Sequence, residues 1–171
     1  GFSNEVTLGE IGVIKQQSAS VMRVRLEGPG ERASRKWRGA ALTQFDGKRW
    51  YNPPSRNEKI LLHNGHGWLA NSAQLSRKGK RLTYEVSINA IDSDALFFTG
   101  QPESLLIGLP MIFRSIGDSY RTAFASSDGS RYVGTSYVGD EVEISGAPVL
   151  PAQLRDELLL LPPTDARILE L

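Results

Sequence analysis

Hydrophobic and polar residues alternate along several segments of the chain, as they do in β-strands with one buried face. Residues 82–88 alternate most regularly, and residues 22–27 repeat the pattern with arginines on the polar side. Shorter apolar runs predict further strands at residues 59–63, 68–75, 95–99, 105–107, 111–114, 120–124, 131–138 and 142–144. We expect residues 120–124 and 131–138 to pair with each other across a turn at residues 127–130.

Residues 37–50 form the segment around which we expect the core to be built. Asp46-Gly47 predicts a turn between two strands, because Gly accepts positive φ freely and Asp tolerates it. Trp37 and Trp50 bracket this strand–turn–strand unit, and each ring can bury a large apolar area. We therefore expect both tryptophans to seed the core.

About ten short strands separated by Gly, Pro and Asp turns predict an all-β fold. The architecture is a two-layer β-sandwich or an open barrel of short antiparallel strands, with short helices at the N- and C-terminal margins. Helical patterns occur over residues 8–14, 151–158 and from residue 165 onward. We expect an irregular N-terminal lead-in at residues 1–17, a β-sandwich domain at 18–147 and a helical linker at 148–171.

The composition and net charge of the chain exclude several classes of function. The 171 residues are 40% hydrophobic and 23% charged, which is typical of one globular domain. A net charge of +1 gives no strong field for nucleic acid or an anionic membrane. The absence of cysteine excludes a disulfide, a thiolate zinc site and a thiol nucleophile within these residues. The last residues look like the start of an amphipathic helix, so we expect the chain to be part of a longer protein.

Two motifs contain residue types that are common in active sites, but neither predicts one. His63 and His66 would need a third ligand to hold a metal, so we interpret them as surface side chains around a turn at residues 64–67. Gly117-Asp118-Ser119-Tyr120 is similar to the nucleophile block of one class of esterases, but no histidine follows it to act as base. We interpret it as a β-turn. No phosphate-binding glycine loop is present, and we predict no cofactor and no metal.

Basic residues gather in two clusters, at Arg32, Arg35, Lys36 and Arg38, and at Arg77, Lys78, Lys80 and Arg81. The second cluster surrounds a predicted hairpin tip at Lys78-Gly79, where charge commonly prevents strands of different molecules from pairing. We expect no nucleic-acid binding, because the total charge is near neutral. A loop facing a membrane surface or an acidic neighbour is the functional alternative.

A set of motifs in fixed order resembles one protein family over essentially the whole chain. The motifs are Phe2-Ser3-Asn4-Glu5-Val6, Leu8-Gly9-Glu10-Ile11-Gly12, Val21-Met22-Arg23-Val24, Trp37-Arg38-Gly39, Phe45-Asp46-Gly47-Lys48-Arg49-Trp50, Tyr84-Glu85-Val86, Leu96-Phe97, Leu160-Leu161-Pro162-Pro163 and Arg167-Ile168. They resemble the exported segment of bacterial membrane-anchored transglutaminase-like proteins. In that family the segment lies between N-terminal transmembrane helices and a papain-like transglutaminase core. Residues 52–71 follow no pattern of the family.

The resemblance implies an extracytoplasmic location in a membrane-anchored parent whose catalytic Cys, His and Asp lie beyond Leu171. The fragment itself is then not an enzyme, whereas the parent is a transglutaminase-like cysteine acyltransferase or peptidase. One hypothesis is a non-catalytic accessory domain that positions or docks this core, its partner.

The alternative is a binding module for an extracytoplasmic peptide, cell-wall polymer or partner protein. Exposed sheet edges can accept an additional strand, and exposed aromatic rings can line a groove. The predicted interaction surface comprises Tyr51, Trp68, Tyr120, Arg77, Lys78, Lys80 and Arg81. The two hypotheses differ in whether the aromatic rings are exposed together.

Overall fold

The computed structural model describes residues 5–7, 20–27, 36–53, 57–69, 79–89, 93–115, 117–138, 155–156 and 159. The strands in chain order are β1 (Glu5–Thr7), β2 (Met22–Glu27), β3 (Trp37–Arg38), β4 (Gln44–Phe45), β5 (Arg49–Tyr51), β6 (Glu58–Leu61), β7 (His66–Trp68), β8 (Lys80–Ile88), β9 (Ala95–Leu96), β10 (Phe98–Thr99), β11 (Gln101–Ile107), β12 (Met111–Arg114), β13 (Tyr120–Arg121) and β14 (Ser130–Val138).

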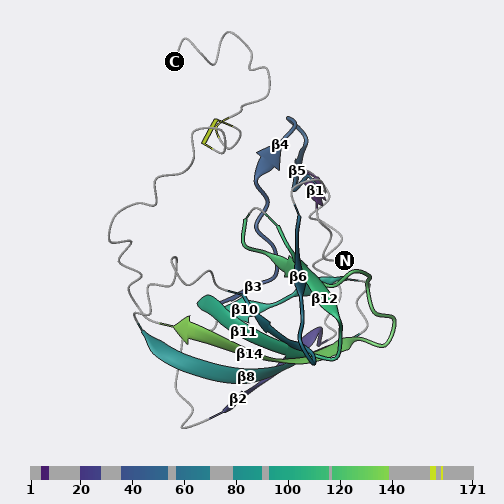
Figure 1. The fold of residues 1–171 in the computed structure, drawn as a ribbon. Helices are drawn as coiled ribbons and strands as arrows, with labels where there is room; N and C mark the ends of the chain where they lie inside the picture. The colour runs from purple at the N-terminus through teal and green to yellow at the C-terminus, as the bar shows by residue number, and fades with distance from the viewer. Residues whose placement is uncertain are drawn as a thin grey trace.

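A five-stranded antiparallel sheet in the order β2-β8-β14-β11-β7 forms the broad base of the molecule (Figure 1). Its long central strands β8 and β14 pair over their whole length. Tyr84, Val86 and Ile88 of β8 are buried, while the residues between them are partly exposed. The alternation predicted for residues 82–88 is therefore confirmed, and β2 confirms the strand predicted at 22–27.

A four-stranded antiparallel sheet in the order β6-β12-β13-β9 forms the second layer. In Figure 1, β6 and β12 lie over the strands of the larger sheet. Leu96, Ile112 and Tyr120 of this layer join Tyr84 and Val86 of the larger sheet in one hydrophobic cluster. The prediction of an all-β sandwich is confirmed, and β6 lies at the sheet edge as predicted for residues 59–63.

Tyr132 of β14 ties the two layers together. Its hydroxyl accepts a hydrogen bond from the Phe97 N–H (2.6 Å) and donates one to the Phe97 carbonyl (2.7 Å). Phe97 lies between β9 and β10, where the chain leaves the four-stranded sheet to pair with β3. The buried strand predicted at residues 95–99 is thus split into two short strands in different sheets.

The prediction for the tryptophan segment is half right. Asp46 and Gly47 make the turn, with Gly47 at φ 96°, but its two arms are β4 and β5. Trp37 belongs to β3, which pairs with β10, and its ring packs edge-on against Tyr84 at 4.8 Å. Trp50 remains 43% exposed. Only Trp37 contributes to the core, because β4 and β5 extend away from the body of the molecule (Figure 1).

The predicted hairpin between residues 120–124 and 131–138 is wrong. β13 ends at Arg121 and pairs with β12 and β9, whereas β14 pairs with β8 and β11. The turn around Gly129 instead connects the two layers. The strand predicted at residues 105–107 is longer than expected, since β11 begins at Gln101 and includes Pro102 beside a register shift.

The margins of the chain are described only in part. Glu5–Thr7 forms strand β1, which differs from the irregular lead-in predicted at residues 1–17. Arg155 and Asp156 are helical, within the helix predicted at 151–158, and the Leu159 N–H donates to the Arg155 carbonyl at 3.1 Å. The strand predicted at 142–144 and the helices predicted at 8–14 and from residue 165 lie outside the described residues. Within the described part, no helix has the length and apolar character needed to cross a bilayer.

Candidate interaction surfaces

The three aromatic residues of the predicted surface have different environments. Trp68, at the end of β7, is 67% exposed, and Tyr51 is half-buried. Tyr120 is buried; its hydroxyl donates to the Leu69 carbonyl at 3.3 Å and its ring contacts Phe98 edge-on at 5.2 Å. Burial also raises the pKa of Tyr120. Tyr120 is therefore part of the core and cannot line an exposed groove.

The basic part of the predicted surface is described at Lys80 and Arg81, while Arg77 and Lys78 lie outside the described residues. The Arg81 guanidinium donates to Glu103 Oε2 at 2.7 Å, and the Tyr137 hydroxyl donates to Glu103 Oε1 at 3.2 Å. The side chain of Glu103 is only 9% exposed. The Glu103 carboxylate raises the pKa of Arg81, chiefly through this hydrogen bond. Arg81 therefore compensates a buried carboxylate, although half of its own side chain remains accessible.

Trp68 belongs to a partly apolar strip on the outward face of the five-stranded sheet. Trp68 lies opposite Ser104 and His66 opposite Leu106 in the β7–β11 ladder, so all four side chains share that face. The His66 and Trp68 rings are 6.2 Å apart, and Leu106 is 44% exposed. A shallow open hollow adjoins the strip and is lined in part by Gly65, Glu85, Leu106, Gly108, Arg131 and Val133. This strip offers an apolar contact next to the Glu85–Arg131 ion pair.

The two histidines face each other across a tight hairpin. The backbone groups of His63 and His66 exchange two hydrogen bonds of 2.9 Å. Asn64 at φ 50° and Gly65 at φ 77° make the turn, which is the combination that two-residue hairpin loops require. The turn was predicted over residues 64–67, but His66 and Gly67 already belong to β7. Over the residues that the structure describes, no three His, Cys, Asp or Glu side chains cluster as metal ligands.

Gly117 and Asp118 make a turn, as predicted, whereas Tyr120 already belongs to β13. Asp118 has φ 53°, and its N–H donates to the Ser115 carbonyl at 3.0 Å. The Ser119 hydroxyl accepts a hydrogen bond from the Ala41 N–H at 2.5 Å. Ser119 therefore fastens the chain leading into β4 to the four-stranded sheet.

A surface that the sequence prediction missed lies on the three-stranded sheet β1-β5-β4. Val6 pairs with Trp50, and Trp50 pairs with Phe45, so the three apolar side chains form one row across the strands. The Phe45 and Trp50 rings stack with centroids 5.0 Å apart and an angle of 25°. Val6 is 44% and Trp50 43% exposed. The Phe-Asp-Gly-x-x-Trp motif carried the signal, because a turn at Asp46-Gly47 places its two aromatic residues opposite each other.

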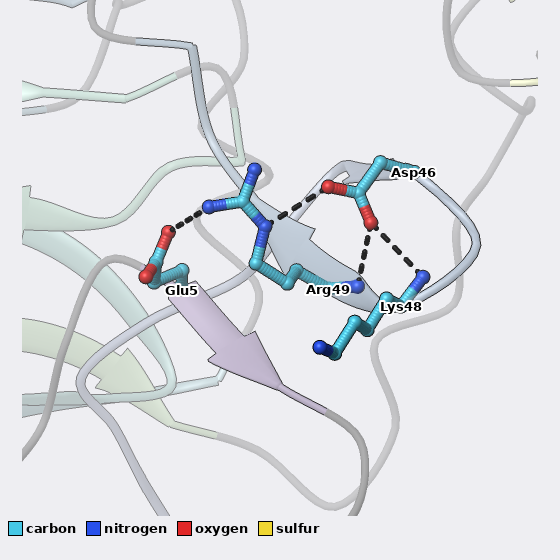
Figure 2. Close-up of polar contacts among 4 residues, drawn as sticks. All are labelled: Glu5, Asp46, Lys48 and Arg49. Atoms are coloured by element: carbon cyan, nitrogen blue, oxygen red, sulfur yellow. Dashed lines mark hydrogen bonds and ion pairs between the residues drawn. The ribbon is translucent and has the colours of Figure 1, made fainter.

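The opposite face of this small sheet is charged (Figure 2). Arg49 lies between two carboxylates: its Nε donates to Asp46 Oδ2 at 2.9 Å and its Nη1 to Glu5 Oε2 at 3.0 Å. Asp46 Oδ1 also accepts the backbone N–H groups of Lys48 (2.9 Å) and Arg49 (2.7 Å). These two backbone donors, followed by the Arg49 side chain, lower the pKa of Asp46 to about 2. The turn is therefore fixed by an ionised carboxylate.

Comparison with known proteins gives one family and one solved fold. A family model described as the TgpA N-terminal domain matches residues 1–143. The crystal structure of the periplasmic domain of TgpA from Pseudomonas aeruginosa has a TM-score of 0.58 at 18% identity, covering 80% of this chain and 43% of that chain. The same domain bound to ethylmercury has a TM-score of 0.56 at 18% identity, with coverage of 80% and 44%. The chain thus spans less than half of the solved periplasmic domains. No curated protein matches it.

Both solved neighbours are periplasmic domains, in agreement with the extracytoplasmic location predicted from the sequence. Their similarity to this chain lies in the fold.

Proposed function

Because this chain belongs to the TgpA N-terminal domain family, we propose that it is a non-catalytic extracytoplasmic accessory domain of a membrane-anchored, transglutaminase-like protein. The match of the family model over residues 1–143 is the observation that carries the proposal. The β-sandwich at residues 18–147 holds the catalytic core in position, and residues 148–171 connect the two. The core of the parent is the partner of this domain and supplies the acyltransferase or peptidase chemistry.

The side chains present in this chain favour a non-catalytic role. The chain has no cysteine, so a thiol nucleophile has to come from another part of the parent. Ser119, the serine of the esterase-like motif, already accepts a backbone hydrogen bond from Ala41. Several charged side chains on the described surface form ion pairs between strands, such as Arg114 with Glu58 across β12 and β6.

An activity comparison tests this proposal. The 171-residue chain and the intact parent are incubated with a glutamine-containing peptide and a fluorescent primary amine, and amide formation and peptide hydrolysis are followed by mass spectrometry. We expect the parent to react and the chain alone to give the rate of the buffer blank. Turnover by the chain alone would refute the proposal.

A second candidate function is a binding module for an extracytoplasmic peptide, cell-wall polymer or partner protein. The exposure of Trp68, at 67%, favours it, because an aromatic ring beside Leu106 on an open sheet face can stack on a ligand. Tyr51, Arg77, Lys78, Lys80 and Arg81 are the other residues proposed for contact. Sedimentation with insoluble peptidoglycan tests this function: binding that is lost in Trp68→Ala supports it, and the absence of binding favours the accessory role.

A further inference from the structure

The sheet β1-β5-β4 has an apolar face that is only partly covered. An antiparallel sheet commonly packs one face on a core and leaves the other in water. Here the charged face carries Glu5 and Arg49, and the apolar face carries Val6, Phe45 and Trp50. Val6 and Trp50 nevertheless remain 44% and 43% exposed. The face that a sheet normally buries is therefore available for contact.

This apolar face is held in a fixed position by its surroundings. At the base of the β4–β5 hairpin, Asn52 Oδ1 accepts the Thr43 N–H (3.0 Å) and the Thr43 hydroxyl (2.9 Å), and Asn52 Nδ2 donates to the Ala41 carbonyl (2.7 Å). At the other end, Arg49 joins β1 to the turn through Glu5 and Asp46 (Figure 2). Preorganisation of this kind lowers the entropic cost of binding.

The charges of the sheet favour a protein partner over a bilayer. Glu5 and Asp46 balance Lys48 and Arg49, and both carboxylates bind the Arg49 guanidinium. Adsorption to anionic lipid requires an excess of basic residues near the surface, which this balance does not provide. A stacked aromatic pair with a neutral surround is instead typical of the centre of a protein interface.

The size of the face favours a partner within the same polypeptide. A row of three side chains is much smaller than the roughly 800 Å² per partner of a stable interface between separate proteins. Tethering raises the effective concentration of the second surface, so a small contact suffices within one chain. The solved TgpA periplasmic domains extend well beyond the matched region, which is 43% and 44% of their length.

We propose that the apolar face of Val6, Phe45 and Trp50 docks against the remaining part of the parent's own extracytoplasmic region, the transglutaminase-like core. The inference rests on the proposed function and deepens it by naming the surface through which the domain holds its core. Trp50 is the central anchor, since it pairs with both Val6 and Phe45. On docking, the Trp50 ring loses its contact with water, whereas Trp68 on the five-stranded sheet keeps its exposure.

Oxidative footprinting of the intact parent in detergent tests this docking. Hydroxyl radicals are generated in the sample, and oxidation of Trp50 and Trp68 is quantified by mass spectrometry in the same molecules. Trp50 is 43% exposed and Trp68 is 67% exposed. In an undocked domain, the oxidation rates of the two tryptophans should therefore agree within about twofold. We expect Trp50 to react at least tenfold more slowly than Trp68. Comparable rates would overturn the proposal.

Two variants and two changes of condition distinguish docking against the core from binding of this face to a bilayer or to a second copy of the chain. Val6→Glu places a charge in the apolar face and should raise Trp50 oxidation at least fivefold, whereas the matched change Thr7→Glu on the opposite face should leave it unchanged. Circular dichroism verifies that both variants fold, and if Val6→Glu does not, the wild-type comparison of Trp50 and Trp68 remains decisive. Protection that requires added phosphatidylglycerol vesicles, or that increases with protein concentration, would overturn the proposal in favour of a bilayer or a second copy.

The docking and the proposed function fail separately. If Trp50 is freely oxidised but removal of the domain lowers the parent's activity, the accessory role stands and the docking surface is wrong. If Trp50 is protected but removal of the domain leaves activity unchanged, docking stands and the accessory role is wrong.

Discussion

Replacing Tyr132 with Phe tests the contact that joins the two layers of the sandwich. The change removes one oxygen atom and leaves the ring, which is 2% exposed and lies 5.8 Å from the ring of Phe98. The Tyr132 hydroxyl is bonded to both the N–H and the carbonyl of Phe97, at 2.6 and 2.7 Å. Phe97 is 6% exposed, so water cannot easily take the place of the hydroxyl.

The magnitude follows from the two buried hydrogen bonds to Phe97 that the change removes. Each such bond contributes about 0.5–1.5 kcal/mol, so we expect the free energy of unfolding to fall by about 2–3 kcal/mol. Small domains are stable by about 5–15 kcal/mol, so this loss is readily measured by urea denaturation.

Tyr137→Phe is the matched control on the same strand. Its hydroxyl donates to Glu103 at 3.2 Å, but Tyr137 is only half-buried and Glu103 keeps its shorter hydrogen bond from Arg81 at 2.7 Å. We expect this control to lose less than about 1 kcal/mol. If Tyr132→Phe lost no more stability than Tyr137→Phe, the assignment of Tyr132 as the link between the layers would be refuted.

Three further predictions concern the core and the hairpin turn. Gly134→Ala should lower the free energy of unfolding by about 1–3 kcal/mol, because its Cβ would lie 2.6 Å from the buried Tyr84 ring. Gly108→Ala, whose Cβ would meet nothing within 4 Å, should change that free energy by less than about 0.5 kcal/mol. If urea denaturation gave both variants the same loss of stability, the packing of Gly134 against Tyr84 would be refuted. Burial raises the pKa of Tyr84 from 10.0 to about 12, so its contribution to stability is complete below pH 10 and is lost as the pH rises toward 12. The free energy of unfolding should fall over this interval by up to about 1.4 kcal/mol per pH unit from this group, and Tyr84→Phe should make the decline shallower; an unchanged slope would contradict the burial. In Arg49→Gln, the Asp46 pKa measured by NMR should stay below 3.8, since the backbone N–H groups of Arg49 and Lys48 lower it most; a return to 3.8 would show that the guanidinium dominates.

The sequence predicted those elements whose local pattern agrees with their burial. β8 alternates because one of its faces meets the core and the other meets solvent, and a period of two is visible without knowledge of its partners. The turn at Asp46-Gly47 is likewise a local property of two residues. The family motifs gave the assignment, since they extend over the length that the family model matches.

Other features depend on contacts between distant segments and were predicted wrongly. Two strands that follow each other in sequence, such as β13 and β14, look like a hairpin, yet they belong to different layers. Trp37 and Trp50 are equally apolar, but only β3 returns to the body, where β10 pairs with it. Local pattern does not specify these pairings.

The composition of the candidate surfaces also depends on contacts that the local sequence pattern does not specify. Tyr120 and Trp68 are both aromatic residues next to turns, but Tyr120 packs in the core between the two layers, whereas Trp68 lies on the outward face of the five-stranded sheet. The apolar row of Val6, Phe45 and Trp50 combines two segments that are about forty residues apart, joined only when β1 pairs with β5. The sequence prediction missed this row for that reason.

We propose that this domain contributes no chemistry of its own but supports the core of its parent. The most direct test replaces residues 18–147 in the membrane-embedded parent with a flexible Gly/Ser linker and measures amide formation on the glutamine peptide at equal protein amounts. We expect the rate to fall at least tenfold while the core remains folded. A variant that retains the full rate of the parent would contradict it.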